Sequence, residues 1–298
     1  MSQIDDLKLK FRSFSIIEKL ITINVVVFVS FYLINTFAYL FNSSSGFITD
    51  WFTFPKELGE FLTKPWSIVT YAFLHSGFWH IASNMIILYF SGKYFVSYLT
   101  GKRVLTVYFL GAIMGAIFYM ISYNLFPVFS EVGSSVLLGA SASVMAILIA
   151  TAAYIPHMSV RLMFIGSVKF WWIAAFFVLL DIIQIPSGNA GGHIAHLGGA
   201  LFGYLYAVQL KKGNDIGSGF EKFMDATVSM FKPKKKSPLK TVHKAKKSKN
   251  AVSKKPGAPK IKNPNQAEID AILDKISKSG YDSLTKQEKD FLFKAGKD

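Results

Sequence analysis

Long apolar stretches alternate with short polar turns over the first two thirds of this chain. A bilayer core requires roughly 20 apolar residues per helix. On that criterion we predict six membrane spans, at Ile21–Phe41, Trp79–Tyr98, Val104–Leu125, Leu137–Ile155, Phe170–Ile185 and Ile194–Leu210. The pattern therefore predicts an all-α, polytopic membrane protein built as a bundle of six transmembrane helices.

Basic residues in the short loops indicate the direction of each span. Lysine and arginine occur in the leader, in the turns after the second and fourth spans, and in the tail after the sixth. The loops after the third and fifth spans, residues 126–136 and 186–192, contain neither. We therefore expect both termini in the cytoplasm, with spans two, four and six running from outside to inside.

The overall composition supports a membrane protein and excludes cysteine chemistry. Of the 298 residues, 51% are hydrophobic and none is cysteine, so disulfides, thiolate nucleophiles and cysteine metal sites are excluded. The first apolar stretch lacks a small-residue cleavage site, which favours a retained anchor over a removable signal peptide. In the first loop, residues 47–65 mix aromatic and charged side chains, a pattern typical of an interfacial element.

Four polar residues lie near the starts of three spans that run in the same direction. His80 and Asn84 begin span two, Ser141 begins span four and His196 begins span six. At 1.5 Å rise per residue, each lies within about two helical turns of the outer surface. A serine and a histidine inside a membrane are costly unless they have a function. Placed at one depth, they predict a nucleophile and its base.

Each of these residues suits one step of peptide hydrolysis. A neutral His196 could accept the Ser141 proton during attack on a carbonyl. The backbone N–H of Ser141, in the first turn of its helix, could stabilise the oxyanion, together with the side chains of His80 and Asn84 at i and i+4. No acidic residue lies near this depth on the helices that carry the serine and the histidine, and Asp181 falls at the end of span five. We therefore expect a Ser–His dyad rather than a triad.

Small residues and a second histidine surround this predicted pair. Gly139 on span four, with Gly199 and Gly203 on span six, predicts close helix packing. His193 precedes His196 by one turn and is an alternative base, but His196 shares the glycine register. No histidine pair has convincing ligand spacing together with a carboxylate, so we expect no metal and no cofactor.

These motifs resemble those of the rhomboid family of intramembrane serine proteases. The resemblance covers roughly residues 15–210, in His75-Ser-Gly-Phe-Trp-His80 with Asn84, Gly139-Ala-Ser141, and Ala195-His196-Leu-Gly-Gly199 with Gly203. It implies Ser141 as nucleophile, His196 as base, and His80 and Asn84 as oxyanion contributors. It also implies cleavage of the transmembrane segments of other proteins, without metal or cofactor.

The chain divides by composition into five segments. We expect a cytoplasmic leader at 1–15, the membrane domain at 16–210, an amphipathic juxtamembrane helix at 211–231, a basic disordered linker at 232–264 and a helical hairpin at 265–298. The formal net charge of +15 sits mostly in the tail. The juxtamembrane position of its lysines favours anionic lipid over nucleic acid as the partner. The hairpin resembles a segment of Bacteroidetes-type rhomboids, which implies the inner membrane of a bacterium.

Two other functions compete with proteolysis. A catalytically inert rhomboid-like adaptor or chaperone would bind membrane helices, but such a protein should have lost Ser141 or His196. A transporter or channel would require a charged pathway through the membrane, and spans two to six carry almost no charge at their centres.

Overall fold

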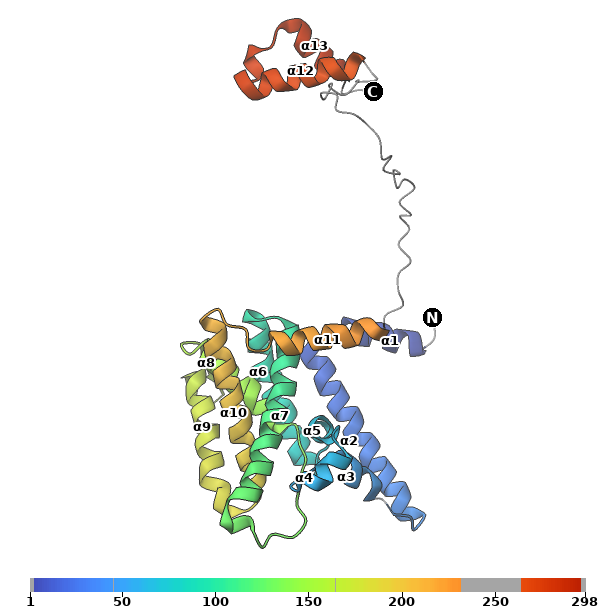
Figure 1. Cartoon of the computed structure of the whole chain (residues 1–298), viewed down its shortest axis with the longest axis vertical. Helices are drawn as coiled ribbons and strands as arrows, with labels where there is room; N and C mark the ends of the chain where they lie inside the picture. Colours follow the sequence, from blue (N-terminus) through green and yellow to red (C-terminus); the bar gives the residue numbers. More distant parts are fainter. Residues whose placement is uncertain (1–2, 45, 164, 232–263, 296–298) are drawn as a thin grey trace, which may run out of the picture. The chain divides into compact units, whose positions relative to one another are not determined.

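The computed structural model describes residues 3–44, 46–163, 165–231 and 264–295. These residues belong to two compact units, Met1–Pro233 and Lys234–Asp298. All but the last residue of the predicted linker at 232–264 lies outside the described residues. Helices dominate both units, which confirms the all-α prediction (Figure 1).

The first unit contains a bundle of long helices with shorter elements between them. Its helices are α1 (Gln3–Ser13), α2 (Ile16–Leu40), α3 (Gly46–Phe52), α4 (Leu58–Thr63), α5 (Ser67–Thr70), α6 (Phe78–Tyr98), α7 (Gly101–Leu125), α8 (Ser141–Tyr154), α9 (Phe170–Gln184), α10 (Ala190–Lys211) and α11 (Ser218–Phe231). Short 3₁₀ turns lie between some of these helices: η1 (Tyr71–Phe73), η2 (Pro127–Phe129) and η3 (Ile185–Ser187). The described part of the unit also contains antiparallel strand pairs, β1 (Phe54–Pro55) with β2 (Val136–Leu137) and β3 (Ser159–Leu162) with β4 (Gly166–Lys169).

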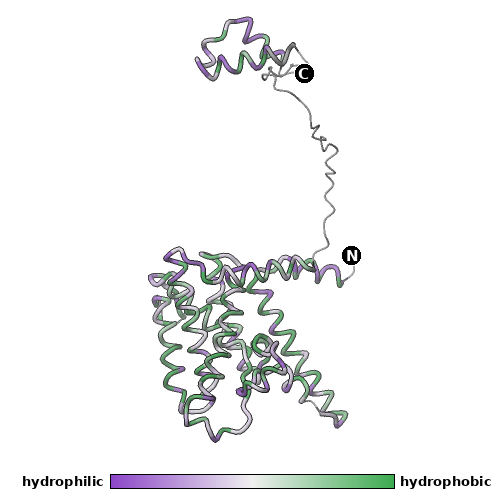
Figure 2. Tube along the Cα trace, in the orientation of Figure 1, coloured by the Kyte–Doolittle hydropathy of each residue, from purple (hydrophilic) through white to green (hydrophobic). Residues whose placement is uncertain are grey.

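Helix α8 lies at the centre of the bundle and packs against α6, α7, α9 and α10. Most of its side chains are buried, whereas α2 and α9 expose large apolar side chains such as Val26, Phe37 and Ile183. Figure 2 shows that apolar residues run along the length of these helices. An exposed apolar surface of this extent is expected where lipid, rather than water, surrounds the protein.

By length and composition, three helical stretches within the described residues could cross a membrane: Ile16–Leu40, Gly101–Leu125 and Phe170–Ser187. Helix α8 is apolar but has only 14 residues. The helix predicted from Leu137 begins instead at Ser141, because β2 and a turn occupy the residues before it. The count of six spans stays a prediction.

The first loop fixes the point at which α8 begins. Strand β1 lies in this loop and pairs with β2, with Phe54 opposite Leu137. The Gly139 N–H then donates to the Tyr71 carbonyl at 2.9 Å. Backbone hydrogen bonds to β1 and to Tyr71 therefore hold the segment that leads into α8.

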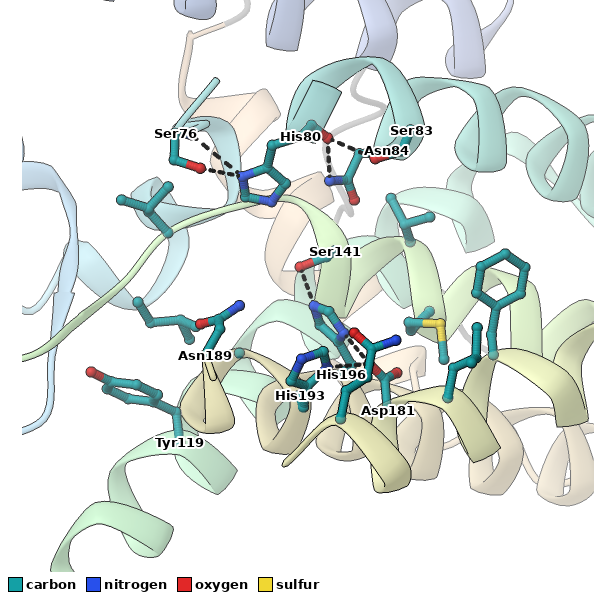
Figure 3. Close-up of a pocket in the computed structure, with 18 of the residues that line it drawn as sticks. Ser76, His80, Ser83, Asn84, Tyr119, Ser141, Asp181, Asn189, His193 and His196 are labelled. Carbon is teal, nitrogen blue, oxygen red and sulfur yellow. Dashed lines mark hydrogen bonds and ion pairs between the residues drawn. The ribbon is translucent and has the colours of Figure 1, made fainter. Parts of the chain in front are cut away.

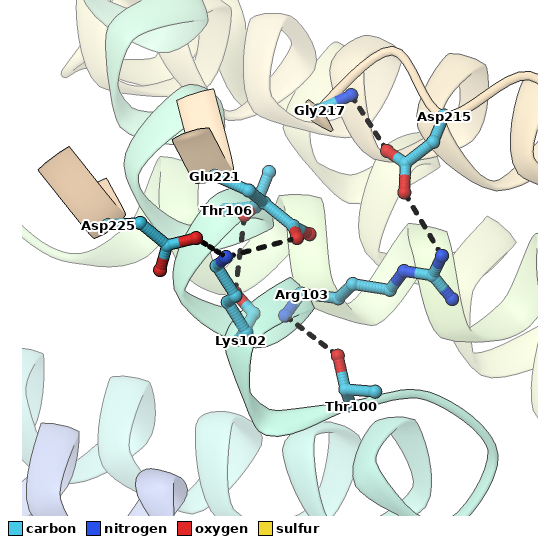
Figure 4. Close-up of polar contacts among 8 residues, drawn as sticks. All are labelled: Thr100, Lys102, Arg103, Thr106, Asp215, Gly217, Glu221 and Asp225. Carbon is cyan, nitrogen blue, oxygen red and sulfur yellow. Dashed lines mark hydrogen bonds and ion pairs between the residues drawn. The ribbon is translucent and has the colours of Figure 1, made fainter. Parts of the chain in front are cut away.

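Helix α11 and the turn before it are attached to the start of α7 by ion pairs (Figure 4). The Arg103 guanidinium contacts the Asp215 carboxylate at 3.0 Å, and the Lys102 ammonium contacts Asp225 at 2.5 Å and Glu221 at 3.7 Å. Figure 1 shows α11 running across the ends of the bundle helices. Its apolar positions include exposed Phe223, as expected of an amphipathic surface helix.

The second unit is a small helical hairpin. It consists of α12 (Pro264–Ser279), the turn η4 (Tyr281–Ser283) and α13 (Lys286–Ala295). Ile272 and Leu284 are buried between its elements. A capping box begins α13, because the Thr285 N–H donates to Glu288 Oε2 at 2.7 Å and the Glu288 N–H donates back to Thr285 Oγ1 at 3.4 Å.

Candidate active site

Close contact between α8 and α10 brings the predicted serine and histidine together. A Cβ added at Gly199 would overlap the carbonyl oxygen of Ala142, and one at Gly203 would overlap that of Ala146. Only glycine at these two positions lets the helix backbones approach so closely. Ser141, the first residue of α8, therefore lies opposite the second turn of α10.

Ser141 and His196 form a hydrogen bond in this structure (Figure 3). The distance from Ser141 Oγ to His196 Nε2 is 2.6 Å. On the other side of the ring, His196 Nδ1 lies 2.7 Å from Asp181 Oδ1. An ionised carboxylate can only accept, so Nδ1 carries the proton of the neutral imidazole. Nε2 is then free to accept the serine proton, as a general base requires.

The position of Asp181 corrects the prediction of a site without a carboxylate, which is wrong. Helix α9 runs opposite to α8 and α10, so its end lies at the depth where those two helices begin (Figure 1). The Asp181 side chain is 10% exposed and contacts His196 directly. Its place near the end of span five was a reason to expect it at this depth.

His193 also contacts Asp181, at 2.8 Å between its Nδ1 and the same oxygen, Oδ1. The two imidazole rings meet edge to face, with centroids 5.8 Å apart. Ser141 is hydrogen-bonded to His196, so among these two histidines the geometry favours His196 as the base. His193 instead shares the carboxylate that orients His196.

His80 faces Ser141 across the cavity, and contacts with Ser76 fix the orientation of its ring (Figure 3). The Ser76 backbone N–H donates to His80 Nδ1 at 3.4 Å, and Ser76 Oγ lies 3.0 Å from the same atom. A backbone N–H can only donate, so Nδ1 is the acceptor and Nε2 carries the proton of the neutral ring. This leaves an N–H donor directed toward the serine. Ser76 is not among the predicted site residues, although its place four residues before His80 is a usable signal.

Gly139 does not make the helix–helix contact predicted for it. It lies two residues before α8 with a φ of +125°, and a Cβ there would come 2.8 Å from the His80 Nε2 atom. Glycine is required because the turn needs a positive φ and the imidazole occupies the side-chain space. The prediction is therefore corrected: Gly139 makes room for His80 beside Ser141.

Asn84 lies one turn after His80 and lines the same cavity. Its side-chain Nδ2 donates to the His80 carbonyl oxygen at 2.7 Å. One of the two N–H groups of this amide is therefore used within α6, and the second is available for another acceptor.

A cavity of about 530 Å³ joins these residues. Its lining includes His80, Asn84, Ser141, Asp181 and His196. It provides room for a peptide segment or water beside the serine hydroxyl. The arrangement can therefore support acyl transfer: a nucleophile, an oriented base and hydrogen-bond donors around one space.

The cavity also contains a set of side chains capable of binding a metal. Donor atoms of Asp181, His193 and His196 all lie within 4.8 Å of one another. Our expectation that no histidine pair is combined with a carboxylate is therefore wrong. The two histidines come from successive turns of α10, while the carboxylate comes from α9, which is why spacing along the chain did not reveal the group.

Comparison with known proteins gives the class of the protein. Residues 62–213 match the model of the rhomboid domain, and this segment is just over half of the chain. The chain therefore belongs to the rhomboid family, and the site described above lies within the matched segment. Residues 260–294 match a family of unknown function (DUF6576), and this match covers all but the last residue of the described hairpin α12–α13.

Three curated relatives carry mitochondrial names. The chain is 31% identical over 157 residues to RHOMBOID-like protein 12, mitochondrial, of Arabidopsis thaliana. It is 28% identical over 162 residues to Rhomboid protein 1, mitochondrial, of Saccharomyces cerevisiae, and 33% over 147 residues to Presenilin-associated rhomboid-like protein A, mitochondrial, of Danio rerio. These matches cover 49%, 51% and 48% of this chain, and 47%, 44% and 37% of the relatives. The chain therefore spans less than half the length of these proteins.

Proposed function

We propose that this chain is an intramembrane serine endopeptidase that hydrolyses peptide bonds in or near the transmembrane segments of other membrane proteins. The observation that carries the proposal is the continuous hydrogen-bonded series from Ser141 Oγ through His196 to Asp181 Oδ1, at 2.6 and 2.7 Å. Membership of the rhomboid family supports it. The series opens into a cavity with further polar donors.

The chemistry follows from this arrangement. Ser141 Oγ attacks the peptide carbonyl carbon while its proton moves to His196 Nε2. The imidazolium that forms is stabilised by Asp181, with which it shares a charge-assisted hydrogen bond. His196 then protonates the leaving amine, and an acyl-enzyme on Ser141 remains. Water entering the cavity repeats the same steps to release the acid.

Oxyanion stabilisation comes from three groups in this proposal. The backbone N–H of Ser141 belongs to the first turn of α8, where amide groups lack partners within the helix. His80 contributes its Nε2–H, and Asn84 contributes the N–H that is not used by the His80 carbonyl. Loss of one such donor typically reduces kcat by about a hundredfold to a thousandfold.

We propose an inside–outside arrangement from the loop charges. Both termini face the cytoplasm of a bacterium, and the cavity opens to the outer side of its inner membrane. The lysines of the 232–264 linker contact anionic lipid headgroups, while residues 16–210 form the catalytic membrane domain. Reporter fusions at each terminus and fractionation of the source cells would test the orientation and would distinguish a bacterial membrane from a mitochondrial one.

Cleavage of a single-span model substrate by reconstituted protein tests the activity. We expect wild type to cut and both Ser141→Ala and His196→Ala to be inactive, with thermal unfolding unchanged. A fluorophosphonate probe should label wild type at Ser141. If wild type neither cleaves nor is labelled, the protein is an inert rhomboid-like adaptor and the proposal is wrong.

A further inference from the structure

The proposed reaction gives no chemical role to His193, which lines the cavity beside Asp181 and His196. His193 is mostly buried, with a side chain 13% exposed, and its Nδ1 lies 2.8 Å from Asp181 Oδ1. In the proposed reaction Asp181 orients His196, and no step uses a second imidazole on the same carboxylate oxygen. Figure 3 shows His193, His196 and Asp181 converging on one place beside the cavity.

These three side chains have the composition of a zinc site. Two imidazole nitrogens and one carboxylate oxygen, with a further position open to solvent, are ligands that Zn²⁺ accepts readily. His193 and His196 are spaced i and i+3 on α10, so both rings project from one face of that helix. Asp181 approaches the same face from α9.

The distances require only a small adjustment to admit the ion. Zn–N and Zn–O bonds of about 2.0–2.2 Å place neighbouring ligand atoms of a tetrahedral site roughly 3.3 Å apart. The two histidine–carboxylate distances are 2.8 and 2.7 Å. The donor nitrogens of the two histidines lie within 4.8 Å of each other. Opening each histidine–carboxylate contact by about half an ångström and bringing the two nitrogens to a similar separation would replace both hydrogen bonds by metal bonds. All three residues line the cavity of about 530 Å³. A hydrated ion can therefore reach them through this cavity.

We propose that Asp181, His193 and His196 bind Zn²⁺ and that the bound ion switches the protease off; the second part rests on the proposed function. Zn²⁺ forms bonds to Nδ1 of each imidazole and to the carboxylate oxygen. Each imidazole keeps one proton, which moves from Nδ1 to Nε2. Nε2 of His196 can then no longer accept the proton of Ser141, and attack on a peptide carbonyl stops.

Binding is tested on full-length, tag-free Ser141→Ala protein, in which the serine plays no part. Zn²⁺ is titrated by calorimetry, and Co²⁺ is followed through its visible absorption bands, which report the ligand geometry. We expect one site, weakened at least about tenfold by an added His193→Gln change, because a lost ligand costs at least as much as a lost outer partner. Glutamine can still donate to Asp181, so it preserves the polar contact. His157→Gln removes an exposed histidine outside the cavity and should leave binding unchanged.

Inhibition is tested on the protein with its serine intact. Zn²⁺ should suppress substrate cleavage and fluorophosphonate labelling, and EDTA should restore both. The His193→Gln variant should be inhibited less by Zn²⁺ than wild type, when the cleavage rate of each protein is compared with its own rate without zinc. Absence of Zn²⁺ binding, or binding equally tight in the His193→Gln variant, would overturn the proposed site. If zinc-free protein neither cleaves nor is labelled, the switch fails together with the proposed function, and the calorimetry still decides the site.

Discussion

Replacing Asp181 by asparagine tests whether the carboxylate takes part in the reaction. The change keeps the shape of the side chain and leaves an amide oxygen that can accept from His196 Nδ1, at present 2.7 Å from Asp181 Oδ1. It removes the negative charge that stabilises the imidazolium in the transition state. The free-energy difference between a charged and a neutral hydrogen bond, about 1–1.5 kcal/mol, sets the lower limit of the effect.

The upper limit comes from the charges themselves. At an effective dielectric constant of about 20 and a charge separation of roughly 4 Å, the attraction is about 4 kcal/mol. The low dielectric value is justified because the side chains of Asp181 and His196 are only 10% and 20% exposed. These limits correspond to a fall in kcat of about 10- to 1000-fold. If the amide N–H instead faced His196, the ring would adopt the wrong tautomer and the loss would be larger.

Steady-state cleavage by reconstituted protein measures this effect. The loss should appear in kcat with KM nearly unchanged, because the charge acts only when the imidazolium forms. Asp215→Asn is the matched control, since it neutralises an ion-paired carboxylate that does not line the cavity. Thermal unfolding of both variants checks the fold. A kcat of Asp181→Asn within about threefold of wild type, less than 1 kcal/mol, would refute the reasoning and restore the Ser–His dyad.

Three further changes test other parts of the structure. Gly199→Ala should destabilise the protein by about 1–3 kcal/mol and abolish cleavage, because its methyl group overlaps a carbonyl of α8; Gly219→Ala, with open space around it, should leave both unfolding temperature and activity near wild type. Ser76→Ala should lower kcat about fivefold, the effect of one hydrogen bond of about 1 kcal/mol, and an unchanged rate would remove the hydroxyl from the site. The Lys275 ammonium and the Thr285 cap lower the pKa of Glu288 to about 2. Since this folded-state pKa is depressed, the stabilisation of α12–α13 is present above the usual pKa of 4.5 and disappears as pH falls toward 2. Hydrogen exchange of the full chain at several pH values would detect this loss of stability. Lys275→Met should make the stability of α12–α13 depend less on pH, and an equally steep pH dependence in that variant would contradict the assignment.

Much of this molecule could be predicted from the chain because the relevant signals are local. Apolar length specifies helices, so the long elements begin and end near their predicted positions. Helical spacing and the direction of each span give the depth of a residue in the bundle. These two signals predict the same depth for Ser141 and His196. The structure adds the 2.6 Å contact between their side chains.

The remaining features depend on which way each helix is rotated and which helices are neighbours. The sequence gives depth along a helix, but it does not give the direction in which a side chain points around the helix axis. The contacts of Asp181 with His193 and His196 join α9 to α10, and they require a rotation of α9 that only side-chain packing sets. Similarly, the sequence around Gly139 predicts a helix-packing residue, but in the tertiary structure Gly139 lies in a turn beside His80. From the chain alone, Ser141 and His196 are predicted to lie at one depth. Only the packing of α9 against α10 brings the Asp181 carboxylate to the His196 ring.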